Sequence, residues 1–356
     1  MTLAAATNEN LAQISNTLIY SAMAVYTLAF FAFITEWSFG SRSKVGRSAA
    51  SLPGRAAAVT AAAGRGEQGA TAVLDKPEII TRSAAGGRDV PDGPGAAGGT
   101  VKGDLYGRIA ISLTVLAFLV HVGGVLARAL SVQRVPWGNM YEFSTTFSMV
   151  VVGAYLALLA AKKNVRWLGL PLVGTVLADL GIAVTWLYTE SDQLVPALDS
   201  YWLIIHVATA IFCGAVFYLG AVTTLLYLFR DSHESKLARG VKPGAFAASV
   251  LERLPSAASL DKFAYRVHAF VFPLWTFTII AGAIWAGDAW GRYWGWDPKE
   301  VWSFITWAAY ACYLHARATA GWKGRKAAVL ALIAFACWLF NYYGVNIFVD
   351  GLHSYA

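Results

Sequence analysis

The stretch that decides the fold is YWLIIHVATAIFCGAVFYLGAVTTLLYLF, residues 201–229, which contains no Asp, Glu, Lys or Arg. A helix needs about 20 apolar residues to cross the roughly 30 Å of hydrocarbon in a bilayer, so this stretch is long enough. On either side of it lie seven further stretches of the same kind, at 17–37, 105–129, 143–161, 167–188, 265–287, 301–320 and 327–349. Together they predict an all-α integral membrane protein with about eight transmembrane helices.

The composition excludes a soluble protein. Of the 356 residues, 57% are hydrophobic and only 14% are charged, which is too little charge to cover a soluble surface. The net charge of +7 does not indicate nucleic-acid binding, because the basic residues lie in loops between the apolar stretches. The three cysteines form no C-x-x-C pattern. A thioredoxin-like redox site, a zinc ribbon and a covalent haem site on this chain are therefore not expected.

Residues 38–104 differ from the rest in composition. They are rich in Ala, Gly, Pro and Arg and show no apolar periodicity. Such a segment cannot bury enough apolar surface to offset the entropy of ordering it. We therefore expect an N-terminal transmembrane helix in 1–37, a disordered cytoplasmic linker in 38–104, and a transmembrane core in 105–356. No basic residue precedes Arg42, so the first apolar run is expected to remain as a permanent span.

The basic residues predict the orientation. With the N-terminus outside, 24 of the 28 Lys and Arg residues lie in inner segments. The four outer ones are Arg128, Arg134, Arg292 and Lys299. Basic residues accumulate on the cytoplasmic side of membrane proteins. We therefore expect a multi-pass protein of the plasma membrane, with both termini and the loops 130–142, 189–200 and 288–300 outside.

The densest cluster of aromatic residues is WGRYWGWDPKE, residues 290–300, in an outer loop. An aromatic belt at the membrane interface is one explanation, but belts scatter their aromatics around the bundle. Flat rings gathered in one turn suit a planar macrocycle, and Arg292 and Lys299 could pair with its carboxylates. The loop PWGNMYE, residues 136–142, is either a further wall of the same cavity or a re-entrant turn.

The histidines extend this pattern. His206 and His353 are both predicted on the outer side, one on each side of the Trp-rich loop in sequence. Two imidazoles approaching from opposite faces are what a six-coordinate haem iron requires. His315 and His121 lie within predicted spans, where an ionisable group marks a candidate functional site. Asp179, also within a span, should face the bundle or a polar cavity.

For the two remaining histidines we predict a position only. His233 is predicted at the surface and His268 at the interface near the inner start of its span.

Residues 290–300 resemble the signature W-G-x-x-W-x-W-D of the haem-handling proteins of cytochrome c maturation. The resemblance is to the CcsA/ResC type of the system II pathway, whose actinobacterial members are named CcsB. LDSYWLIIHV around His206, WAAYACYLHARATAGW around His315 and GVNIFVDGLHSYA at the C-terminus are similar to that family as well. The likeness extends over about 105–229 and 260–356.

This resemblance implies specific roles. His206 and His353 would be paired external axial ligands of a transiently bound haem b, and His315 a membrane-embedded ligand completed by a ResB-type partner subunit. The platform beneath the external haem would be formed by Trp290, Trp294, Trp296 and Asp297.

The implied function is presentation of haem to apocytochrome c, whose C-x-x-C-H thiols then form thioether bonds. A thioredoxin-like thiol reductant fits this pathway as a further partner. If the chain is an enzyme, it is a component of a membrane holocytochrome c synthase, a haem lyase.

Two other functions remain open at this point. A membrane b-type cytochrome that transfers electrons needs histidine pairs on shared helices, and no predicted span holds two. A small-solute transporter needs a polar site at the midplane, commonly between related halves. Asp179 and His121 are the only candidates for such a site, and no internal repeat is evident.

Overall fold

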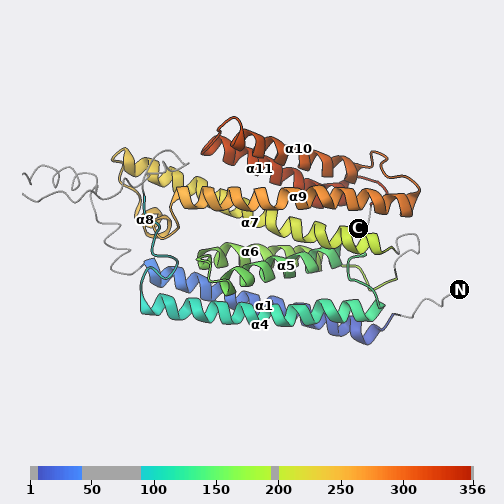
Figure 1. Cartoon of the computed structure of the whole chain (residues 1–356). Helices are drawn as coiled ribbons and strands as arrows, with labels where there is room; N and C mark the ends of the chain where they lie inside the picture. The colour runs from blue at the N-terminus through green and yellow to red at the C-terminus, as the bar shows by residue number, and fades with distance from the viewer. Residues whose placement is uncertain (1–6, 42–89, 194–199, 354–356) are drawn as a thin grey trace, which may run out of the picture.

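A computed structural model describes residues 7–41, 90–193 and 200–353. Within these ranges the chain is helical and contains no strand. Its eight long helices run side by side along a common direction (Figure 1). Their bounds are α1 Glu9–Ser41, α4 Val101–Val132, α5 Met140–Ala160, α6 Gly169–Thr185, α7 Tyr201–Ala238, α9 Ala257–Trp290, α10 Pro298–Ala318 and α11 Arg325–Leu339. The all-α architecture predicted above is confirmed.

Shorter elements complete the chain. A 3-10 turn, Arg166–Leu168, precedes α6, and the short helix α8, Ala245–Leu251, precedes α9. After α11 the chain continues through a π-helical segment, Phe340–Gly344, into α12, Val345–Phe348. π-Helical turns are rare and often lie at functional sites. This one faces the candidate site described below.

Seven of the helical segments are long and apolar enough to cross a membrane. These are α1, α4, α5, α6 with its preceding turn, α7, α9, and α11 with α12. The eighth predicted span, 301–320, corresponds to α10, which has sufficient length at 21 residues but is less apolar. Tryptophans, tyrosines, His315 and Arg317 interrupt its apolar residues. Arg317 pairs with Asp261 of α9 at 2.7 Å, and both side chains are buried.

The helices pack in pairs. α1 lies along α4, α7 along α9, and α10 along α11, while α5 and α6 occupy the middle (Figure 1). Small residues at the α1–α4 contact, such as Ala22, Ala29, Ala110 and Ala117, are completely buried. Small residues let helix backbones approach closely within a membrane, where apolar burial alone gives no driving force between helices.

The connections divide between the two ends of the bundle. The loops 133–139, 186–193 and 291–297, together with His353, lie at one end, on the right in Figure 1. The turns 161–165, 239–256 and 319–324 lie at the other end. This grouping agrees with the alternation that the basic residues predict.

The predicted linker 38–104 differs from the structure at both of its ends. α1 continues to Ser41 and α4 begins at Val101. The segment before α4 is fixed on the α8–α9 connection, where the Arg253 guanidinium donates to Ala96 O at 2.6 Å. In addition, Gly95 N donates to Arg253 O at 2.9 Å. Composition could not predict this, because the segment is held by hydrogen bonds to the distant residues Arg253 and Ser256 and not by a periodic apolar face. Residues 42–89 lie outside the described ranges.

Candidate functional site

Asp297 organises the Trp-rich loop. It is the N-cap of α10, where its side chain accepts from Lys299 N at 3.1 Å, and Glu300 completes a capping box. The loop leaves α9 at Gly291, whose φ of 68° ends that helix. The Arg292 guanidinium lies over Gly295, where a Cβ would otherwise be, so a larger residue there would displace Arg292. Both glycines therefore shape the loop itself.

The same carboxylate fixes His353. The His353 Nδ1–H donates to Asp297 Oδ1 at 2.8 Å, and Leu352 N donates to Oδ2 at 2.7 Å. Burial raises the pKa of the Asp297 carboxyl, but the hydrogen bonds from His353 and Leu352 outweigh it and lower the pKa to about 2. A carboxylate behind an imidazole sets its tautomer and orientation, which is the usual arrangement behind metal-ligating histidines.

His206 is oriented by a backbone group instead. It lies in the second turn of α7, and its Nδ1–H donates to the carbonyl oxygen of Thr278 on α9 at 2.9 Å. This assignment of the proton leaves the ring lone pair on Nε2. The ring stacks on Trp285, with centroids 6.0 Å apart and planes 16° apart. Gly282 allows this close packing, since a Cβ there would lie 2.6 Å from the imidazole.

His206 and His353 line one cavity. It encloses about 910 Å³ of empty space, including its open mouth. Trp285 contacts both imidazoles, with its ring centroid 5.9 Å from that of His353, and Trp290 lies closer, at 4.7 Å. Further aromatic walls come from Trp137, Phe143, Trp275, Trp338 and Tyr342. The cavity is therefore mostly apolar and aromatic, with a few convergent polar groups, as ligand sites usually are.

A second, smaller cavity adjoins the first. It has about 440 Å³ of empty space and shares His206, His353 and Lys299 with the main cavity. Its own walls include Trp294 and Glu300. The two histidines thus lie where the two cavities meet.

The two cations predicted to meet ligand carboxylates differ in position. Lys299 lines both cavities, and its ammonium donates to Asn341 O at 2.7 Å. Arg292 lines neither cavity and instead pairs with Glu300 at 3.5 Å. Of the pair, Lys299 is the one placed to meet a bound anion.

The predicted tryptophan platform is divided. Trp290 contacts His353, and Trp294 lines the second cavity. Trp296 lines neither, is 71% exposed, and has a φ of 60°, which is uncommon for a residue other than glycine. It meets Trp294 edge to face, with centroids 5.7 Å apart. Trp296 therefore supports the loop from outside the cavity.

His315 lies apart from this group. It is exposed near the C-terminal end of α10, toward the opposite end of the bundle, and lines neither cavity. The structure therefore brings eight of the nine predicted site residues together around the loop and the cavities, and leaves His315 separate. Four of the eight line a cavity, namely His206, His353, Lys299 and Trp294. Trp290 and Asp297 contact His353, while Arg292 and Trp296 lie outside the walls.

The expectations for two other histidines are wrong. His233, predicted at the surface, is 3% exposed and lies 3.3 Å from Glu252, because α7 extends to Ala238 and buries it. His268, predicted at the interface, is completely buried between Tyr310 and Tyr313. The extension also places two histidines, His206 and His233, on one helix, although at opposite ends of it.

The remaining polar groups in spans are mostly within the bundle. Asp179 accepts from Ser148 at 2.6 Å and from the Tyr343 hydroxyl, so its predicted inward orientation is confirmed. His121 is completely buried, with Nδ1 3.4 Å from the Tyr26 hydroxyl. Neither lines the cavities.

Sequence reasoning missed several cavity residues. Trp275, Trp285 and Asn341 lie inside apolar helices, where nothing distinguishes them from packing residues. Residues 137–140 do line the cavity, which favours the first of the two interpretations given to that loop. The π-helical segment that presents Asn341 has no recognised sequence signal.

Comparison with known proteins identifies the family of this chain. The sequence profile of the family described as cytochrome C assembly protein matches residues 110–353. The proteins named cytochrome c biogenesis protein CcsA from Synechococcus sp. (strain JA-3-3Ab) and Gloeobacter violaceus are 33% and 31% identical to this chain. Each alignment covers 70% of this chain, and 84% and 87% of the respective relative. The protein of the same name from Porphyra purpurea is 30% identical over 277 residues.

The matched region begins in α4 and ends at His353, so it includes the Trp-rich loop and both cavity histidines. A role in cytochrome c maturation is supported by this match and by the relatives. The chain belongs to the cytochrome c assembly protein family and is a multi-pass membrane protein of the CcsA type.

Proposed function

We propose that this chain binds haem b as a transient substrate between His206 and His353 and presents it to apocytochrome c. The observation that carries the proposal is that two histidines, one on α7 and one in the turn after α12, line one aromatic cavity, each with Nδ1 held by a fixed acceptor. Fixed imidazoles suit haem iron, and cavity-lining tryptophans such as Trp285 and Trp275 suit the faces of its ring.

The chemical character of the cavity walls matches that of haem. Haem is flat and largely apolar, with two carboxylates at one edge. The main cavity is walled by aromatic side chains and holds one lysine, Lys299. When bound, haem supplies the vinyl groups to which the two thiols of a C-x-x-C-H segment add. This chain would bind and orient the haem and exclude water from it.

Whether the chain is a haem lyase by itself is a separate matter. The proposed division of labour makes it a component of a membrane holocytochrome c synthase, because the thiols and the vinyl groups carry the bond-forming chemistry. A thioredoxin-like reductant would keep those thiols reduced.

A ResB-type subunit is the proposed partner at His315. This imidazole is exposed on α10 and lies away from the cavity. An exposed polar ring on a membrane helix is costly in lipid, and a ligand shared with a second subunit would relieve that cost. Haem would pass from this position to the cavity histidines.

The proposed orientation places the cavity on the outer face of the plasma membrane. The cavity lies at the end of the bundle that carries the loops 133–139 and 291–297. The basic residues concentrate in the segments at the other end. The N-terminal helix 1–37 and the haem-handling core 105–356 are proposed as separate functional parts.

Neither alternative function gains an observation of its own. A b-type cytochrome would use two histidines on one helix, but His233 of α7 is held near Glu252 and lines neither cavity. A transporter would centre on Asp179, whose carboxylate is occupied by Ser148 and Tyr343.

The test is the absorption spectrum of the purified protein, alone and co-expressed with its ResB-type partner. His206→Ala, His353→Ala and His315→Ala are compared with the parent, and His233→Ala serves as a control at the far end of α7. We expect a low-spin bis-histidine spectrum that is lost in His206→Ala and His353→Ala and is kept in His233→Ala. In His315→Ala we expect less total haem when the protein is co-expressed with its partner. The proposal would be refuted if cells with either cavity variant matured cytochrome c normally and if no preparation of the protein contained haem.

A further inference from the structure

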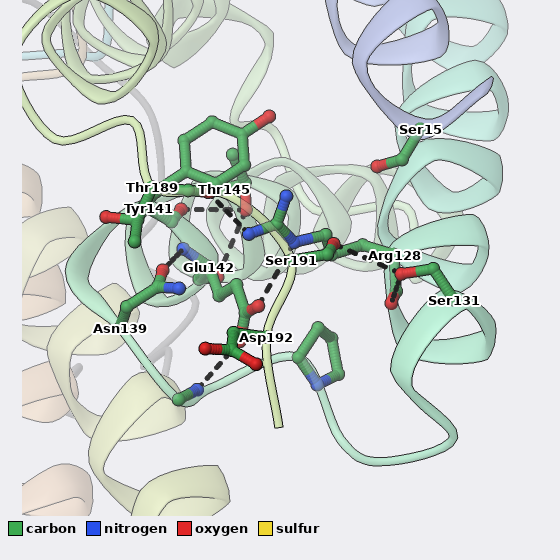
Figure 2. A network of polar contacts seen from close by, with 12 residues as sticks. Ser15, Arg128, Ser131, Asn139, Tyr141, Glu142, Thr145, Thr189, Ser191 and Asp192 are labelled. Carbon is green, nitrogen blue, oxygen red and sulfur yellow. Dashed lines mark hydrogen bonds and ion pairs between the residues drawn. The ribbon is translucent and has the colours of Figure 1, made fainter. Parts of the chain in front are cut away.

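The wall of the main cavity formed by residues 137–140 is held by a buried charge cluster. The Glu142 carboxylate, with 0% side-chain exposure, accepts from Gly138 N at 2.8 Å and from Arg134 Nη1 at 2.8 Å. It also accepts from Arg128 Nε at 3.0 Å. Figure 2 shows the Arg128 side chain meeting Glu142 beside Asn139, the N-cap of α5. One carboxylate thus joins two guanidinium groups to the cavity wall.

The cluster has an excess of positive charge. The two arginines face a single carboxylate, and their remaining bonds go to neutral carbonyls. Arg128 donates to Thr189 O at 2.6 Å, and Arg134 to Asp192 O at 2.7 Å. Their side chains are only 3% and 12% exposed, so water screens this charge poorly.

The excess charge lies directly behind the cavity. Gly138 lines the cavity, and a Cβ added to it would lie within 2.8–2.9 Å of the Arg134 guanidinium. One residue without a side chain therefore separates this cation from the cavity. The N-terminus of α5, which begins at Met140 in the same wall, adds the positive end of its helix dipole.

Two further groups add hydrogen-bond donors to this wall. Lys299 donates its ammonium to the main-chain oxygen of Asn341, and both residues line the cavity. Asn341 is 4% exposed, and its Oδ1 has no hydrogen-bond partner, while its Nδ2 donates to Ser303 Oγ at 3.1 Å. Turning the amide would let the Ser303 hydroxyl donate to Oδ1 and would make the amide N–H groups available to an anion.

The second cavity shares Lys299 with the main cavity but adds a carboxylate. Glu300 lines it and accepts from the backbone N–H groups of Gly295 and Asp297 at 2.8 and 3.0 Å. A carboxylate in this wall disfavours a second anion beside it. The second cavity therefore offers an anion less positive charge than the main cavity does.

We propose that residues 137–140, Lys299 and Asn341 form a carboxylate-binding subsite for the acidic edge of the macrocycle, with Arg134 as the residue that positions this wall and makes it positive. The inference rests on the proposed function and adds the orientation of the ligand to it. The apolar edge then lies toward the second cavity, beneath Trp294.

The test compares haem with haem dimethyl ester, in which both carboxylates are neutral. Dissociation constants are measured by absorption titration of the purified, haem-depleted protein with its partner. For Arg134→Gln we expect haem to bind about tenfold more weakly, as loss of one charge behind a poorly screened wall suggests, and the ester to bind within about twofold of the parent. Arg134→Lys should retain most of the preference for haem.

Arg292→Gln is the matched control, because Arg292 also pairs with a glutamate at this end of the bundle but lines neither cavity. It should leave the preference unchanged. Asn341→Asp is a second, nearly isosteric variant, and its added charge should weaken haem binding alone.

The outcomes separate the two proposals. Equal losses of haem and ester in Arg134→Gln would show a role in folding only, and no loss of either would show no role, so both results overturn the subsite. A parent protein that gives no His206-dependent low-spin spectrum with either ligand overturns the proposed function, and the subsite with it.

Discussion

The substitution Asp297→Asn tests how the site is held together. The carboxylate accepts three N–H groups, from His353, Leu352 and Lys299. Asparagine keeps the shape, but one of its two terminal groups becomes a donor and must face one of these donors. Loss of a hydrogen bond to a charged group costs about 1.5–3 kcal/mol. Loss of the partner behind a metal-ligating histidine weakens binding about 10–100-fold, which is about 1.4–2.7 kcal/mol.

The assay is an absorption titration of the haem-depleted protein, with Asp261→Asn as the control. Asp261 is a buried carboxylate of similar exposure that pairs with Arg317 and lines neither cavity. We expect the dissociation constant for haem to rise at least tenfold in Asp297→Asn and to stay within about twofold of the parent in the control. Haem binding by Asp297→Asn within twofold of the parent, with His353 still ligated, would refute the role given to this carboxylate.

Three further predictions concern pH and stability. The pKa of the Asp297 carboxyl is lowered from 3.8 to about 2, so its contribution to stability is complete above pH 4 and is lost as the pH falls toward 2. In acid unfolding, the free energy of unfolding of the parent should therefore exceed that of Asp297→Asn above pH 4, and the difference should be lost toward pH 2. Gly107→Ala should lower the melting temperature, since the new Cβ would collide with the ion pair between Arg166 and Glu36. Breaking a buried ion pair costs about 3–5 kcal/mol, so an unchanged melting temperature in detergent would contradict this prediction. His268→Leu should leave the melting temperature equal or higher, because both ring nitrogens are buried without a partner; a fall of several degrees would mean that the ring has one.

Much of the fold could be predicted from local composition. The apolar runs located all eight long helices, because crossing a bilayer demands a length and polarity that no other role requires. Their ends were less predictable: α7 extends beyond 229 to Ala238, and the segment before Val101 is held by Arg253. Both depend on tertiary contacts that composition does not encode.

The site was predictable where its chemistry is unusual. Histidines and clustered tryptophans are rare in membrane proteins, so His206, His353 and the loop 290–300 could be identified from sequence. Arg292 and Lys299 could not be distinguished, because their different roles follow from the partners that each one meets in the folded chain, Glu300 for Arg292 and Asn341 for Lys299. The Glu142 cluster was also not predicted, since its three residues come from two helices and the loop between them.

The central claim is that His206 and His353 ligate the same iron. The most direct measurement is the electron paramagnetic resonance spectrum of the purified ferric protein, together with His206→Gly and His353→Gly, each with and without added imidazole. The account predicts one low-spin bis-imidazole species in the parent, loss of that species in either variant, and its recovery when imidazole occupies the space of the missing ring. A low-spin signal that survives in either variant without imidazole would contradict the account.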